Sequence, residues 1–203
     1  MSKIVKHIYI SNSRLFVDGA LVLRGESSIF VKFLKEVYKF VEIKYPKYFK
    51  MDALSKLGFV ASEVLLHDQE KPKMAERVGI AVGNRASTYL VDTKHQQSIE
   101  DKENYFPSPS NFVYTLPNVM TGEICIRNGF KGENAVFVSE KFDIPFLVDY
   151  LNVILQADKA DRMVAGYINA DVDDYEAFLF IVDRTAEQLN AKEIQGLYES
   201  YHS

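Results

Sequence analysis

The sequence feature that most constrains the fold is the continuous apolar run at residues 135–138, Ala-Val-Phe-Val, which follows two glycine-containing turns. Such a run is typical of a strand buried on both faces of a sheet. A helical pattern covers residues 146–155, and Pro145 suits the first turn of that helix. Residues 162–168 form the next predicted strand. Strand, helix and strand in this order predict a βαβ unit with parallel strands.

The rest of the chain also alternates between short strand patterns and helical patterns. Further strands are predicted at residues 7–10, 14–17, 78–82 and 177–182, the last buried on both faces. Helices are predicted at residues 27–41, 54–65, 87–98, 118–127 and 185–198. Asp52 is the expected cap of the second helix, and Thr185 that of the last. The fold class is therefore α/β.

Composition places the chain among ordinary globular proteins. Its 203 residues are 47% apolar and 26% charged, which suits one domain spanning residues 1–203. The net charge of −4 disfavours nucleic acid as a partner and provides no polybasic patch for a membrane surface. No apolar run approaches the roughly 20 residues that span a bilayer, and the N-terminus does not resemble a signal peptide. We therefore expect a cytoplasmic protein.

One stretch carries a family resemblance. The motif residues, in order, are Asn118 and Gly122, Gly129 and Gly132, Val136 to Ser139, and Ala165-Gly166. Their order resembles the N-terminal half of the β-ketoacyl-ACP synthases, which have the thiolase fold. Lys50-Met51-Asp52 is similar to the family's Arg-Met-Asp segment, and the clearest resemblance covers residues 50–185. It implies a thiolase-like half: a mixed, mostly parallel five-stranded sheet with helices on both faces.

The same alignment puts Lys141 at the position of the family's nucleophilic cysteine. A condensing enzyme needs a thiolate there, activated at a helix N-terminus. The family's catalytic histidines lie in its C-terminal half, and this chain has about half the family's length. The resemblance therefore implies a pseudoenzyme without catalytic residues or cofactor. Glu140 and Asp143 are expected to pair with Lys141; a Schiff-base enzyme using Lys141 remains a third, disfavoured hypothesis.

The resemblance also implies a partner. In polyketide and aryl-polyene pathways, an active synthase pairs with an inactive chain-length factor, and this chain looks like a shortened version of that factor. The alternative is a homodimer that binds an acyl chain or acyl carrier protein without catalysis. Residues expected at the interface or pocket are Thr93, Gln96, Phe112, Tyr114, Asn118, Val136, Val138 and Phe142.

Other reactive residue types give weaker signals. Cys125, the single cysteine, lies inside the predicted helix at residues 118–127 and is expected to be a small buried apolar residue. The four histidines are scattered, so no metal site is predicted. The carboxylates of the segment after residue 170 lack the spacing of an EF-hand loop and are interpreted as a solvated turn. These are Asp171, Asp173, Asp174 and Glu176.

Overall fold

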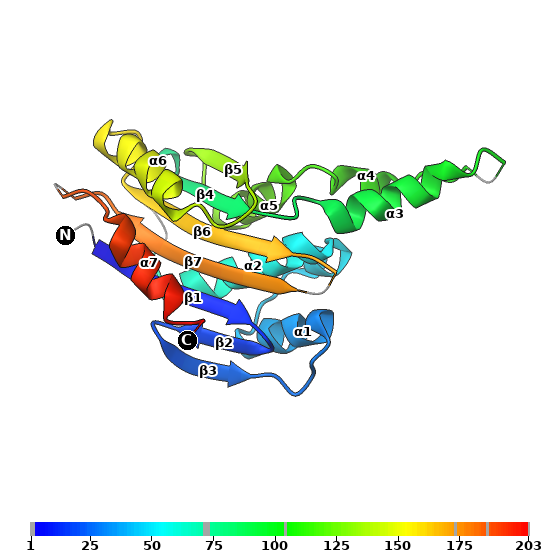
Figure 1. Ribbon diagram of the computed structural model, residues 1–203, viewed down its shortest axis with the longest axis horizontal. Helices are drawn as coiled ribbons and strands as arrows, with labels where there is room; N and C mark the ends of the chain where they lie inside the picture. Colours follow the sequence, from blue (N-terminus) through cyan, green and yellow to red (C-terminus); the bar gives the residue numbers. More distant parts are fainter. Residues whose placement is uncertain (1–2, 71–73, 104, 173, 186, 203) are drawn as a thin grey trace.

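The structure, a computed structural model, describes residues 3–70, 74–103, 105–172, 174–185 and 187–202. Its centre is a seven-stranded sheet with the order β3-β2-β1-β7-β6-β4-β5 (Figure 1). The strands are β1 (Lys3–Ser11), β2 (Arg14–Val17), β3 (Ala20–Arg24), β4 (Val78–Asn84), β5 (Asn134–Val138), β6 (Arg162–Ala170) and β7 (Tyr175–Asp183).

The prediction of a mostly parallel five-stranded sheet is wrong in detail. Among the described strands, two pairs are parallel, β4–β5 and β4–β6, whereas the other four pairs are antiparallel. The N-terminal strands form tight hairpins, which can connect only antiparallel strands. β3 was missed because the Asp18-Gly19 turn leads directly into another short strand. β5 and β6 do run parallel, but β4 lies between them.

Helices cover both faces of the sheet, as the resemblance implied. One face carries α1 (Phe30–Phe40), α2 (Ala53–Leu66) and α5 (Asn118–Asn128), together with the short turn η1 (Pro46–Lys50). The opposite face carries α6 (Ile144–Gln156) and α7 (Ala191–Glu199). The remaining helices are η2 (Ala75–Arg77), α3 (Tyr89–Glu100) and α4 (Pro109–Val113). Among the described residues, no helix combines the length and apolar character needed to cross a membrane.

β7 lies between two layers of helices, one on each face of the sheet, and is apolar along almost its whole length. Ala177, Leu179 and Ile181 belong to the core beneath α2. The alternate residues, Phe178, Phe180 and Val182, belong to the core beneath α6 and α7. Because successive side chains point to opposite faces, both sets must be apolar. The prediction that residues 177–182 are buried on both faces is therefore confirmed.

The apolar run at residues 135–138 behaves differently. β5 pairs only with β4 and lies at the edge of the sheet. Its central residues are half-buried, and Val138 is 53% exposed. The prediction of burial on both faces is therefore wrong for β5, because an edge strand has a neighbour on one side only.

The ends of two helices test the capping predictions. Asp52 caps α2, as predicted: its carboxylate accepts from the backbone N–H groups of Leu54 and Ser55, both at 3.1 Å. The predicted start of the last helix at Thr185 is wrong, since α7 begins at Ala191 with Asn190 as its cap. Just before α7, the Asn152 side-chain amide exchanges two hydrogen bonds with the backbone of Leu189.

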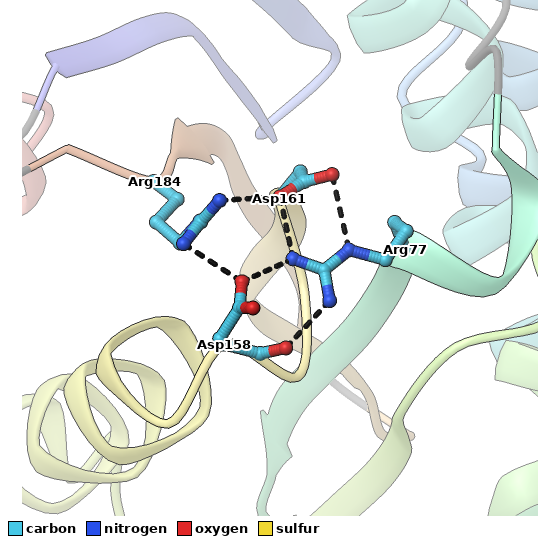
Figure 2. A network of polar contacts seen from close by, with 4 residues as sticks. All are labelled: Arg77, Asp158, Asp161 and Arg184. Carbon is cyan, nitrogen blue, oxygen red and sulfur yellow. Dashed lines mark hydrogen bonds and ion pairs between the residues drawn. The ribbon is translucent and has the colours of Figure 1, made fainter.

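α3 and α4 pack against each other and extend away from the sheet as an arm, drawn in green at the right of Figure 1. At the opposite end of the strands, Arg77, Asp158, Asp161 and Arg184 form a network of ion pairs (Figure 2). The network joins η2, the loop before β6 and the residue after β7. It therefore fixes the starts of β4 and β6 to the end of β7.

Candidate functional site

The turn at residues 139–143 joins β5 to α6 and is held at both ends. Ser139 donates its backbone N–H to the Asn84 carbonyl at 3.0 Å and its hydroxyl to the Lys141 carbonyl at 2.7 Å. At the other end, the Asp143 carboxylate accepts from the backbone N–H of Phe146 at 3.1 Å and so caps α6. Pro145 lies in the first turn of α6, as the sequence predicts.

Lys141 is exposed within this turn, three residues before the first residue of α6. The expected pairing with its neighbours is wrong. No ion pair joins Lys141 to Glu140 or Asp143, all of which lie in the described part of the chain, and Asp143 caps the helix instead. A Schiff-base lysine needs an apolar enclosure or a neighbouring cation to activate its amine. The exposed position of Lys141 offers no such enclosure.

An apolar groove of about 360 Å³ lies beside the turn. Val136, Val138 and Phe142, three of the predicted interface residues, all line it. Phe146 of α6 also lines it and is 48% exposed, with its ring 4.9 Å from that of Phe137. The groove is therefore an open apolar surface that continues directly from the edge strand.

The free edge of β5 presents unpaired backbone groups next to the groove. The Ile80 N–H donates to the Glu133 carbonyl, and the Ser139 N–H donates to the Asn84 carbonyl, so these odd-numbered residues of the β5 segment face β4. In a parallel pair, alternate residues point their N–H and C=O groups to opposite sides. Asn134, Val136 and Val138 consequently direct both groups away from β4. This edge can accept a further strand.

The other predicted interface residues lie elsewhere. Thr93 and Gln96 are exposed on α3, and Phe112 is exposed on α4, with its ring 5.5 Å from that of His95. Asn118 is the exposed first residue of α5. Tyr114 is buried, at 8% exposure, where α4 meets the body of the molecule. Its hydroxyl donates to the buried Glu123 carboxylate at 3.3 Å.

Asn84 positions the turn and was not predicted from the sequence. The Asn84 side chain is fully buried and donates to the Ile168 carbonyl at 2.7 Å, while its backbone carbonyl accepts from Ser139. It also accepts from the backbone N–H of Ser87. Asn84 therefore links β4, β6, the β5–α6 turn and the base of the arm. Its place directly after an apolar strand, in Gly83-Asn84, is the signal that could have identified it.

The cysteine and the described carboxylates of the acidic segment lie apart from the β5–α6 turn. Cys125 is half-buried on α5, away from the turn, and burial raises the pKa of its thiol to about 11. Asp173 lies outside the described residues. Glu176 is not part of a solvated turn, as was predicted, but belongs to β7, where its carboxylate accepts from the Tyr198 hydroxyl at 3.0 Å. Within the described ranges, no three His, Cys, Asp or Glu side chains form a group able to hold a metal ion.

No protein-family model matches this chain, and no curated protein is detectably similar to it in sequence. Solved structures are similar in fold. The ishigamide ketosynthase/chain length factor superposes with a TM-score of 0.63 at 16% identity, covering 91% of this chain and 63% of the other. A ketosynthase (ApeO) in complex with its chain length factor (ApeC) from Xenorhabdus doucetiae gives 0.56 at 10% identity, covering 92% and 80%.

A third similar structure is AntDE:AntF, a type II PKS acyl-carrier protein in complex with its ketosynthase bound to the hexaketide. It has a TM-score of 0.56 at 16% identity and covers 89% of this chain and 62% of the other. This chain thus spans less than two thirds of the length of the first and third of these structures. At these identities the comparison shows the fold, which is thiolase-like.

Proposed function

We propose that this chain, which has the thiolase-like fold of ketosynthases and chain length factors, is a non-catalytic, chain-length-factor-like subunit of an active β-ketoacyl synthase. The setting would be cytoplasmic fatty-acid, polyketide or aryl-polyene-type biosynthesis, with residues 1–203 forming one synthase N-terminal-like domain. The observation that carries the proposal is the β5–α6 turn. It has Lys141 where the resemblance requires a cysteine, and it adjoins a free strand edge and an apolar groove.

The chemistry of the turn supports a non-catalytic role. A lysine cannot be acylated to a thioester, and its cation is poorly placed near the positive end of the α6 dipole. The one thiol of the chain, Cys125, is on a different helix with a raised pKa, so it does not supply the missing thiolate. The turn adjoins the apolar groove, which suits contact with a partner or an acyl chain.

The edge of β5 supports a role in pairing. An added strand would satisfy the outward backbone groups of Asn134, Val136 and Val138, each hydrogen bond contributing about 0.5–1.5 kcal/mol. The exposed side chains of Val138 and Phe146 would be covered in the same event. The similar structures include ketosynthase–chain length factor and ketosynthase–carrier protein complexes, so a synthase is the proposed partner, with acyl carrier protein as a further one.

Size-exclusion chromatography with light scattering tests the proposal, on this chain alone and co-expressed with a β-ketoacyl synthase encoded beside its gene. We expect a one-to-one complex with the synthase. A homodimer that does not exchange with the synthase would instead support the alternative, an acyl-binding module that uses the same groove. A chain that stays monomeric beside every neighbouring synthase would contradict both.

A substitution at the turn tests the absence of catalysis. Lys141→Ala should leave the condensing activity of the reconstituted pair unchanged within about twofold, because no proposed step uses the amine. The activity assay should include a synthase variant lacking its own cysteine as the inactive control. Loss of activity in Lys141→Ala, with the complex still intact by light scattering, would make Lys141 catalytic and sink the pseudoenzyme proposal.

A further inference from the structure

A second cavity, of about 230 Å³, lies where the arm meets the body of the molecule. α1, the start of α2, α3 and α4 all contribute to its wall. Lys50, Lys56 and Lys94 line it together with a single carboxylate, Asp52. Met51, Val91 and Tyr114, all buried, supply an apolar part of the wall. The cavity thus combines concentrated positive charge with an apolar surface.

The cations of this cavity have no carboxylate partners. Lys6, Lys47 and Lys131 each form an ion pair elsewhere in the molecule. By contrast, no described carboxylate lies within ion-pair distance of Lys50, Lys56 or Lys94. Although the chain has a net charge of −4, the three ammonium groups around this cavity make it locally positive.

Asp52 offsets only one of the three positive charges of the cavity. Both of its carboxylate oxygens are engaged by the Leu54 and Ser55 N–H groups at the start of α2. Those helix N–H groups are therefore occupied as well, so the lysines and not the helix terminus would hold a ligand. Lys56 uses one ammonium N–H on the Met51 carbonyl at 2.6 Å and keeps two donors.

The environment of Lys56 shows that the charges interact. Burial is the main cause that lowers the pKa of Lys56, and the nearby Lys35 and Lys94 lower it further, while Asp52 acts in the opposite direction. Repulsion of this kind is relieved when an anion binds between the cations. A bound anion should therefore raise the pKa of Lys56, which provides a readout independent of affinity.

We propose that this cavity binds a phosphate monoester. Three cations against one carboxylate leave two positive charges, which match a dianion better than the single charge of a carboxylate. Ammonium groups bind phosphate through charge-assisted hydrogen bonds. The apolar wall at Met51, Val91 and Tyr114 is suited to the organic stem of an ester, which inorganic phosphate lacks.

Because the cavity lies between the arm and the body of the molecule, a bound ligand would restrict the movement of the arm. Lys94 belongs to α3 of the arm, whereas Lys50 and Lys56 belong to the body at the end of η1 and the start of α2. A dianion held between them would tie the arm to the body. Hydrogen exchange of the α3 amides should therefore slow when the ligand binds.

The experiment uses the full chain and compares inorganic phosphate with butyl phosphate in NMR titrations, with chloride at equal ionic strength as the reference. Saturable binding of both is expected, with butyl phosphate at least about threefold tighter because its stem reaches the apolar wall. The Lys56 pKa should rise, and exchange in α3 should slow. Equal binding of the two phosphates would overturn the monoester assignment, and effects that chloride reproduces would overturn the site.

Variants locate the binding. Lys94→Gln should weaken butyl phosphate binding about tenfold or more, and Lys94→Arg should restore most of it because the charge is retained. Lys192→Gln, which removes an exposed cation from α7 on the opposite face, is the matched control. Equal losses in Lys94→Gln and Lys192→Gln would contradict the proposal. The inference does not depend on pairing with a synthase, so either can fail without the other.

Discussion

The sheet has two edges, and they are built differently. At the β3 edge, the pairing with β2 shifts register between Leu15 and Phe16, and Arg14 lies directly opposite Arg24. A bulge and a charged side chain on the edge strand, here Arg24, both hinder the addition of another strand. At the β5 edge, the pairing with β4 is regular over five residues, and the outer side adjoins the apolar groove.

This difference indicates which edge serves assembly. Leu21 on β3 and Val138 on β5 are exposed to similar extents, 44% and 53%, so exposure alone does not distinguish the edges. The backbone does, because β3 is protected against pairing and β5 is not. A partner should therefore add to β5 while β3 remains free.

The largest effect is expected on stability, from a substitution at the centre of the sheet between the two edges. Gly166 on β6 has φ +146°, and a side chain there would collide with the Phe178 carbonyl of β7. Gly166→Ala should lower the free energy of unfolding by more than about 4 kcal/mol or prevent folding. Urea denaturation measures it. Gly122→Ala, on α5 with open space around it, is the control and should stabilise by about 0.5–1 kcal/mol.

The next largest effect is expected on the affinity for the proposed synthase, and matched substitutions at the two edges compare them directly. Val138→Asp should weaken the proposed synthase complex about a hundredfold, since it places a charge in the apolar part of the interface. Leu21→Asp makes the same change at the β3 edge and should leave the affinity unaltered. Isothermal titration calorimetry or surface plasmon resonance provides both values. Equal losses from the two variants would remove the distinction between the edges.

A smaller loss of affinity is expected when only one outward backbone N–H of β5 is removed. Val136→Pro deletes an N–H that points away from β4, so the β4–β5 ladder should survive while edge pairing loses one hydrogen bond. Affinity for the partner should fall about tenfold. Val136→Thr keeps the N–H and the β-branched shape, and its affinity should match that of the parent. Unchanged affinity in the proline variant would show that the partner does not pair with this strand.

The smallest effect is expected on stability, from the ion-pair network that joins the starts of β4 and β6 to the end of β7. Hydrogen bonds from Arg77 are the main cause that lowers the pKa values of Asp158 and Asp161. A lowered carboxylate pKa contributes stability above the unfolded value, near pH 4, and that stability is lost as the pH falls further. The groups are exposed, so the contribution should be small and should shrink in 1 M salt.

Thermal unfolding at pH 2.5–7 of the parent and of Arg77→Gln checks this. The difference in unfolding temperature between the two proteins should vanish near pH 2.5. Asp52 has a pKa raised by burial and so acts in the opposite direction, but it is common to both proteins. A difference that persists at pH 2.5 would assign the stabilising role of Arg77 to packing instead of ion pairing.

Local chemistry explains which features could be predicted. The cap at Asp52, the start of α6 near Pro145 and the two-faced burial of β7 depend on neighbouring residues and on side-chain periodicity. The edge position of β5 could not be predicted in this way, because four apolar residues in a row also occur in a central strand. The burial of Tyr114 could not be predicted either, because it depends on packing against the core beneath α2, where its hydroxyl also donates to Glu123.

The pairing of β1 with β7 has a consequence for the order of folding. Ile8 lies opposite Leu179, so two strands far apart in the sequence are neighbours in the middle of the sheet. During synthesis, the hairpins of β1, β2 and β3 can form early. β1 cannot pair with β7 on its other side until most of the chain has been synthesised. Such long-range closure slows folding and leaves an apolar strand uncovered meanwhile. A nascent chain stalled before residue 175 should therefore be a strong chaperone substrate.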